Sequence, residues 1–301
     1  MSHLDFLRIL KVFSEADGST AWSLNQNNVF ATASVIIPEQ TAREIWGDGR
    51  AVVANGPPTS SVKALPVDGG YRLSGRWNFS TGSPHATWFA ALVPMEHPRD
   101  QQDASTGRVS TRIILFPKED ATILDSWQVS GLRGTGSFSF EVNDLYVPST
   151  RTYVSTNALR ENGGLYAIPR TLIFSSGDAT IALGIARASL TSAIDLAGTK
   201  TPGRTSTMLQ DLPATQRLIE EGEAIWHSAQ AFLVDSASLV WSSACKNHAL
   251  AIEERIRLRL ASTYAIRKGA EVVDISYNLC GSSAIFASNP IQRRFQDIHV
   301  I

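Results

Sequence analysis

A seven-residue apolar repeat in the last third of the chain is the feature that most constrains the fold. In residues 212–241, apolar side chains recur every seven residues in two neighbouring columns, which predicts a long helix with one buried stripe. The first column is Leu218, Ile225, Phe232 and Leu239, and the second is Ile219, Trp226, Leu233 and Val240. Asp211 and Pro213 suit the start of this helix, and a further helical pattern stops at Gly281. The segment 169–301 therefore predicts a helix bundle.

The middle of the chain has the period of β-strands instead. Four aromatic or apolar side chains share one predicted strand face at period two: Tyr71, Leu73, Trp77 and Phe79. An Asp-Gly pair, Asp68–Gly69, comes just before them and predicts a hairpin turn. A second alternating run loses its phase near Asp144, which indicates a bulge or a strand end. The polar, Gly- and Pro-containing segment 96–108 predicts a surface loop.

The N-terminal part of the chain predicts helix, interrupted at Gly18 with Ser19 as the cap of the next helix. The order is thus helices, then strands, then long helices, which is typical of the α+β class and not of alternating α/β folds. We expect three domains: the end of an N-terminal helical domain (1–33), a middle β-domain (34–152) and a C-terminal helical domain (153–301).

Composition excludes several classes of protein. The formal net charge is -1, so no broad positive field favours nucleic acid or an anionic membrane as a partner. The two cysteines, Cys245 and Cys280, are too few for a disulfide framework, and a reducing, cytoplasmic setting is the simple interpretation. The six histidines form no H-x-x-x-H pair, so we expect no metal site.

Two motifs that would indicate other classes of enzyme, a phosphate-binding loop and a hydrolase elbow, are not found in the sequence. The segment "GLRGTGS" (131–137) lacks the G-x-G-x-x-G spacing and the Walker lysine, and a strand follows it where a phosphate loop needs a helix. No G-x-S-x-G elbow occurs, which disfavours an α/β-hydrolase. The plain interpretation of 131–137 is a tight turn.

The segment "GRWNFSTGSPHATW" (75–88) combines alternating aromatic residues with a run of hydroxyl groups. Taken without context, it is most simply a core strand followed by a turn. The alternative is a wall that holds a flat ring, because Ser80, Thr81 and Ser83 add hydrogen-bonding groups beside an apolar surface. For His85 we favour a packing role over proton relay.

This segment, together with "DSWQVSGLRGTGSFSFEVNDLYVP" (125–148), resembles the middle β-domain of the acyl-CoA dehydrogenase superfamily. The resemblance is closest to the group D two-component flavin-dependent monooxygenases. "ALGIARASL" (182–190) and "GSSAIFASNPIQRRFQDIHV" (281–300) resemble parts of their C-terminal domain. The family implies a helical N-terminal domain, a β-barrel-like domain and a four-helix bundle, assembled as a homotetramer. Compared with the family, the chain has a short N-terminal helical part and stops before a segment that carries a His near the flavin.

The resemblance implies an oxygenase component that hydroxylates a small organic substrate, which we expect to be aromatic. Reduced FMN or FAD, with FMN slightly favoured, would react with O₂ to a C4a-(hydro)peroxyflavin inside a site that excludes water. A separate NAD(P)H-dependent flavin reductase would supply the reduced flavin, since no NAD(P)H-binding motif is visible. The alternatives are an acyl-CoA dehydrogenase-type flavoenzyme that oxidises an acyl thioester, and an inactive fragment of the fold.

The same resemblance assigns roles to individual residues. Phe79 would lie against the isoalloxazine ring, and Ser80 or Thr81 would hydrogen-bond near its N5 and O4 edge. Other residues implied to bind or approach the cofactor are Asn55, Gly56, Arg133, Ser137 and Arg204. The catalytic candidates are Ser80, His85 and His299. For Arg204, a flavin phosphate contact and a solvated loop residue remain equal alternatives.

Overall fold

The computed structural model of the 301-residue chain describes residues 1–95, 111–154, 158–203 and 205–301. The predicted surface loop at 96–108 and Arg204 lie outside the described residues. The chain forms two compact units. A helical unit contains Met1–Asn25, Val129–Gly134 and Gly163–Ile301, and a sheet unit contains Gln26–Gln128 and Thr135–Asn162. The three-domain division stays a prediction.

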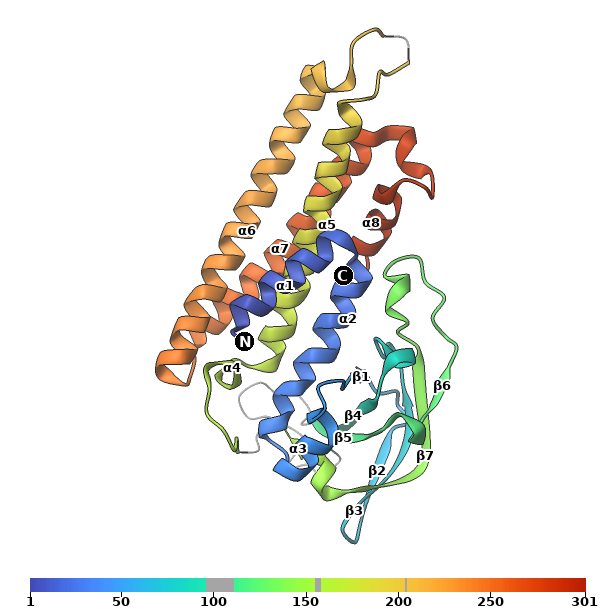
Figure 1. The fold of residues 1–301 in the computed structure, drawn as a ribbon, viewed down its shortest axis with the longest axis vertical. Coiled ribbons are helices and arrows are strands. Elements are labelled where there is room, and N and C mark those ends of the chain that lie inside the picture. Colours follow the sequence, from blue (N-terminus) through green and yellow to red (C-terminus); the bar gives the residue numbers. More distant parts are fainter. Residues whose placement is uncertain (96–110, 155–157, 204) are drawn as a thin grey trace. The chain divides into compact units, whose positions relative to one another are not determined.

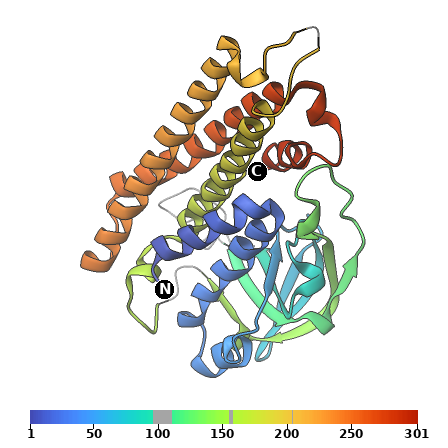
Figure 2. The same ribbon diagram turned by 45° about the horizontal axis from the view of Figure 1, so that its top comes forward.

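Three long helices form the main body of the helical unit (Figure 1). The shorter α8 lies beside α5 and α7 (Figure 2). The helices of this unit are α1 (His3–Ala16), the first part of α2 (Gly18–Val29), α4 (Gly164–Ala167), α5 (Arg170–Ala197), α6 (Pro213–Asn247), α7 (Ile252–Cys280) and α8 (Pro290–Ile298). Within the described residues, α5 alone is long and apolar enough to cross a membrane by composition. Because 61% of its apolar window is buried inside the protein, this is the core helix expected of a bundle.

The two apolar columns of α6 differ in how deeply their side chains are buried. Trp226, Leu233 and Val240 of the second column are buried. In the first column the side chains are only partly buried, and Leu239 is exposed. The second column is therefore the buried face of α6, and the first column lies on a flank of the helix that the rest of the unit covers only in part.

The predicted end of one helix is confirmed, and the predicted cap of another is wrong. The predicted stop of α7 is confirmed, since Gly281 follows it with a positive φ of 54°. Ser19 is not the cap of α2. The helix begins at Gly18, and Asp17 caps it by accepting the Thr20 N–H at 2.7 Å. Asp17 takes this role because α1 ends at Ala16 and leaves Asp17 extended between the helices.

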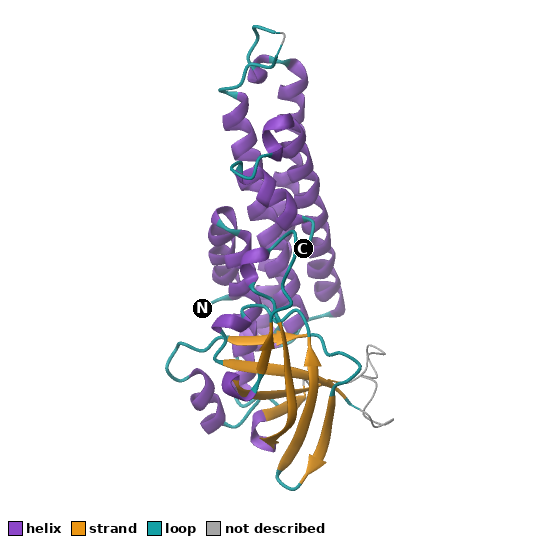
Figure 3. Ribbon diagram, turned by 90° about the vertical axis from the view of Figure 1, so that its right-hand side faces the viewer, coloured by secondary structure: helices purple, strands orange, loops and turns teal. Residues whose placement is uncertain are grey.

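The described strands of the sheet unit form two four-stranded sheets, which are drawn as arrows in Figure 3. Their orders are β1-β4-β5-β8 and β2-β3-β7-β6. The strands are β1 (Val53–Gly56), β2 (Lys63–Val67), β3 (Gly70–Trp77), β4 (Trp88–Pro94), β5 (Thr111–Pro117), β6 (Thr122–Leu124), β7 (Ser139–Pro148) and β8 (Thr152–Val154). The unit also holds α3 (Glu39–Trp46) and the last part of α2.

Aromatic rings fill the core of the sheet unit. Phe140 of β7 stacks on Trp77 at 5.0 Å between ring centroids and contacts Phe89 at 4.2 Å. The predicted irregularity near Asp144 is confirmed, because the β3–β7 register shifts there and Asp144 has a φ of +52°. The predicted placement of Phe79 on the strand face is wrong: β3 ends at Trp77, and the chain then turns.

Candidate functional site

The turn after β3 presents an aromatic ring at the surface of the sheet unit. Trp77 anchors the end of the strand, since its indole N–H donates to the Leu92 carbonyl at 2.9 Å. Phe79 then adopts a left-handed φ of 54°, and the residue is 62% exposed. This conformation costs a non-glycine residue about 1–2 kcal/mol. The Ser80 N–H helps to hold it by donating to the Phe138 carbonyl at 2.9 Å.

The end of β1 packs closely against this turn. A Cβ at Gly56 would lie 1.9 Å from the Asn78 carbonyl oxygen and 2.8 Å from Ser80 Oγ, so only glycine fits. Asn55 precedes it on the same strand and is half-buried. The structure thus brings the predicted residues of β1 beside those of the turn.

A row of buried hydroxyl groups continues from the turn. Thr81 Oγ1 lies 2.9 Å from Ser137 Oγ, which lies 2.7 Å from Thr135 Oγ1. The Asn27 side-chain amide donates to the Thr81 carbonyl at 2.9 Å and fixes the backbone there. Thr81 and Ser137, which the resemblance placed near one ring, are therefore hydrogen-bonded to each other.

Ser80 differs from the adjacent Thr81 in the hydrogen bonding of its hydroxyl group. Its side chain is fully buried, and its Oγ has no hydrogen-bond partner among the described residues. A buried hydroxyl without a partner is unusual in a folded protein, and an external acceptor or donor would satisfy it.

Trp127 belongs to this site, although the sequence assigned it no role. Its ring meets that of Phe79 edge-on, with centroids 6.0 Å apart and an interplanar angle of 85°. Its buried Nε1 has no partner among the described residues. The only signal in the sequence is that Trp127 lies in the motif 125–148 that carries the family resemblance.

Two of the predicted basic or titratable residues are exposed at the surface of their own unit. Arg133 is an exposed residue in the segment of the helical unit that contacts α8. His85 ends the short turn η2 (Ser83–His85) of the sheet unit and is exposed. The packing role favoured for His85 is therefore wrong, because the turn directs this residue to the surface.

His299, at the end of α8, is engaged within the helical unit. Its Nδ1 lies 2.7 Å from the Phe295 carbonyl, and its Nε2 lies 3.2 Å from an Asp274 oxygen. Both ring nitrogens are thus occupied, which leaves neither available as a base in this conformation.

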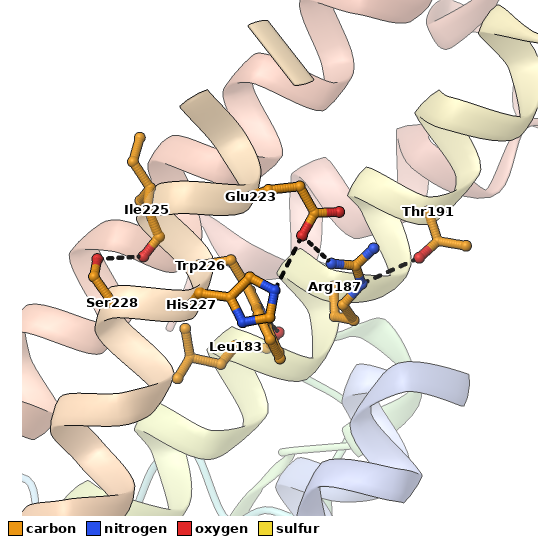
Figure 4. Close-up of polar contacts among 8 residues, drawn as sticks. All are labelled: Leu183, Arg187, Thr191, Glu223, Ile225, Trp226, His227 and Ser228. Carbon is orange, nitrogen blue, oxygen red and sulfur yellow. Dashed lines mark hydrogen bonds and ion pairs between the residues drawn. The ribbon is translucent and has the colours of Figure 1, made fainter. Parts of the chain in front are cut away.

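Other polar features of the helical unit have structural explanations. Figure 4 shows Arg187 of α5 paired with Glu223 of α6. The Arg187 guanidinium donates to the Glu223 carboxylate at 2.7 Å. The hydrogen bond from Arg187 lowers the pKa of the Glu223 carboxyl below its usual value. The Trp226 N–H donates to the Leu183 carbonyl at 2.8 Å, so these contacts join α5 to α6.

An open surface depression with a volume of about 530 Å³ lies between the end of α5 and the segment after α7. Polar side chains provide much of its lining: Ser192, Asp195, Thr199, Ser283, Ser288 and Asn289. None of the predicted site residues within the described ranges lines it. The described residues contain no group of three or more His, Cys, Asp or Glu that could hold a metal ion.

Comparisons with known proteins identify the fold. Residues 176–301 match the C-terminal domain of acyl-CoA dehydrogenases. XiaF from a Streptomyces species, solved in complex with FADH2 and glycerol, aligns with a TM-score of 0.88 and 23% identity, covering 100% of this chain and 76% of that chain. The fold is therefore that of the acyl-CoA dehydrogenase superfamily.

Comparison with sequence relatives identifies the family within this superfamily. The chain is 28% identical over 298 residues to indole-3-acetate monooxygenase of Pseudomonas putida, covering 98% of this chain and 74% of the relative. It is 30% identical over 266 residues to the pigment production hydroxylase of Rhodococcus erythropolis, covering 85% and 67%. The chain belongs to the two-component flavin-dependent monooxygenases of the acyl-CoA dehydrogenase superfamily.

The residues of the sheet unit fit the cofactor of this family, reduced FMN or FAD. A flavin has a flat apolar ring body and a polar edge. Phe79 offers an exposed aromatic surface, and Ser80 and Trp127 each hold a buried polar atom without a partner among the described residues. Such groups are what a flat ring with acceptor atoms would satisfy.

Proposed function

We propose that the chain is an oxygenase component that hydroxylates a small aromatic compound. The observation that carries this proposal is the pairing of an exposed, strained aromatic ring at Phe79 with the buried, unpartnered hydroxyl of Ser80. Strain of this kind is kept where the surrounding structure imposes it and function uses it. A packing role alone would not leave the ring outside the core.

Each residue of the turn has a distinct part in this proposal. Phe79 supplies an apolar wall that excludes water, while Ser80 and Thr81 supply hydrogen bonds to the flavin. Asn55 lines the approach, and Gly56 allows close contact by the backbone. Ser137 orients the Thr81 hydroxyl through the 2.9 Å contact.

Reduced flavin, when bound, supplies the two electrons that activate O₂ for insertion of one oxygen atom into the substrate. The protein's contribution is a dry environment and a fixed substrate position. His85 remains the proton-transfer candidate of the sheet unit on the family resemblance alone, since its exposed ring contacts none of the residues assigned to the flavin among the described contacts. His299 is the weaker candidate because both of its ring nitrogens are engaged. Arg133 remains a candidate for a flavin contact, supported by its exposed guanidinium.

The substrate class is proposed from the relatives. The relative from Pseudomonas putida is named for indole-3-acetate, so an indole or a comparable aromatic ring is the first candidate. A separate NAD(P)H-dependent reductase would deliver the flavin in the cytoplasm. A homotetramer is supported by an exposed apolar stripe on α7, formed by Ile252, Ile256 and Leu260, which another copy of the chain could cover.

The proposal is tested with isotopically labelled oxygen. The chain is mixed with a flavin reductase, NADH, FMN or FAD, and a panel of indoles and phenols under ¹⁸O₂. Incorporation of one ¹⁸O atom into a hydroxylated product is expected, and it should fall at least tenfold in Ser80→Ala. Consumption of NADH that yields only hydrogen peroxide with every substrate class would overturn the proposed aromatic hydroxylation.

A further inference from the structure

The indole N–H of Trp127 is a buried donor that the fold leaves unused. Its Nε1 has no hydrogen-bond partner within the described part of the chain. Two buried tryptophans, Trp77 and Trp226, show the usual arrangement: Trp77 donates to the Leu92 carbonyl and Trp226 to the Leu183 carbonyl. Most buried donors are satisfied, so the exception at Trp127 requires an explanation.

The neighbours of Trp127 hold it in place by a polar network. Ser126 Oγ lies 3.0 Å from Ser139 Oγ and accepts the Ser139 backbone N–H at 2.9 Å. Ser139 Oγ in turn donates to the Asn78 side-chain oxygen at 2.9 Å. This network ties the residue before Trp127 to the residue before Phe79. The edge-on contact of the two rings is therefore fixed from both sides, and the unused N–H is part of a built arrangement.

We propose that Trp127 is a flavin-binding residue whose indole N–H donates to an acceptor atom of the cofactor. This inference rests on the proposed function. The flavin ring carries carbonyl and imine acceptors at its polar edge, and an indole N–H is a donor that has no acceptor capacity of its own. It is also neutral at every working pH, so it adds a hydrogen bond without a titrating proton near the reacting atoms.

The unused donor predicts different effects on stability and on binding. In the flavin-free protein, the buried N–H has lost its water and gained no partner, which is unfavourable. Trp127→Phe keeps an aromatic ring beside Phe79 but removes the donor together with the five-membered ring of the indole. Loss of an unpaired donor offsets part of the packing lost with the smaller ring, so the flavin-free variant should lose less stability than Trp226→Phe, which also loses a formed hydrogen bond. The flavin dissociation constant should rise about 5- to 20-fold, as expected for one lost hydrogen bond.

The experiment measures both quantities on the full chain. Flavin fluorescence titration gives the dissociation constants for FMN and FAD, and thermal unfolding is followed with and without flavin. Trp226→Phe is the matched control, because its N–H already donates to the Leu183 carbonyl. This control should lower the unfolding temperature and leave the dissociation constant within twofold.

Each outcome decides the matter. Weaker flavin binding by Trp127→Phe, with a smaller loss of flavin-free stability than in Trp226→Phe, supports the inference. Unchanged flavin binding overturns it, and so does a loss of flavin-free stability equal to or larger than that of Trp226→Phe. If wild type binds flavin but shows no ¹⁸O incorporation, the proposed function fails while the role of Trp127 stands. If wild type binds no flavin, both fail.

Discussion

The hydroxyl groups of Thr81 and Ser137 lie 2.9 Å apart although 56 residues separate them in the chain. Thr81 follows the end of β3, and Ser137 precedes the start of β7, so pairing of these two strands brings the hydroxyls together. Thr135 extends the row with a 2.7 Å contact to Ser137. The position of the Thr81 hydroxyl, which the proposed flavin contact uses, is thus fixed by a residue that lies just before another strand.

Ser137→Ala is expected to disturb the position of the Thr81 hydroxyl. The variant should still bind flavin, but the ratio of hydroxylated product to hydrogen peroxide should fall several-fold because the Thr81 hydroxyl loses one fixed partner. Loss of a buried hydrogen bond should also lower the free energy of unfolding by about 1–2 kcal/mol. Peroxide and product are measured in the same reaction. Ser60→Ala, at an exposed turn, is the control, and an unchanged ratio in Ser137→Ala would contradict the expectation.

Gly56→Ala should damage the site through its backbone. The added Cβ would approach the Asn78 carbonyl oxygen to 1.9 Å, and backbone atoms cannot give way without moving β1 or the turn. We expect a loss of about 3 kcal/mol or more in unfolding free energy, together with loss of flavin binding. Denaturant unfolding and flavin titration measure the two effects. Gly203→Ala has no atom within 4 Å of its added Cβ and should be neutral; equal behaviour of the two variants would argue against the packing described.

Asp297 tests how the segment 129–134 is held in the helical unit. Its carboxylate accepts the Leu132 backbone N–H at 2.6 Å. Burial raises the pKa of Asp297, although the bond from Leu132 and the charge of Arg293 partly oppose this. Asp297→Asn keeps an acceptor and removes a buried charge, so it should match wild-type stability within about 1 kcal/mol at pH 7. Asp297→Leu should lose about 1–3 kcal/mol because the bond to Leu132 is gone.

The same carboxyl predicts a pH dependence with a defined sign. Because the pKa in the folded protein is raised, the folded state holds the proton more tightly than the unfolded state does. The contribution of Asp297 to stability is therefore greatest at low pH and is lost as pH rises through the folded pKa. Wild type should gain stability relative to Asp297→Asn as pH falls from 7 toward 4. The opposite trend in paired thermal unfolding curves would show that the charged form is the favoured one.

His3 should make the protein acid-sensitive. Its ring is buried beside the Ser176 hydroxyl at 3.1 Å, and burial lowers its pKa from 6.5 to about 4. The folded state therefore resists the proton that the unfolded state takes up near pH 6.5. This contribution is fully present above pH 6.5 and falls by about 3 kcal/mol as pH drops toward 4. His3→Gln should flatten the unfolding free energy over this range, whereas the exposed-site variant His227→Gln should keep the wild-type slope.

The sequence predicted the elements that depend on local periodicity. The seven-residue repeat located α6, Gly281 ended α7, and the phase change at Asp144 located the bulge. Predictions from the sequence were wrong where a single residue determines the exact start or end of a helix or strand. Ser19 and Asp17 are both good caps, and only the exact end of α1 selects Asp17. A strict period of two also could not show that β3 stops at Trp77.

The sequence by itself therefore determined the order of helices and strands, and the motif that carries the family. Only the tertiary structure decided which hydroxyl is paired and which is left without a described partner, since Ser80 and Thr81 are adjacent and chemically similar. It likewise turned Phe79 outward and placed Trp127 against it. The physical reason is that periodicity is read from neighbouring residues, whereas hydrogen bonds and ring contacts depend on which distant strands pair and how their ends are anchored.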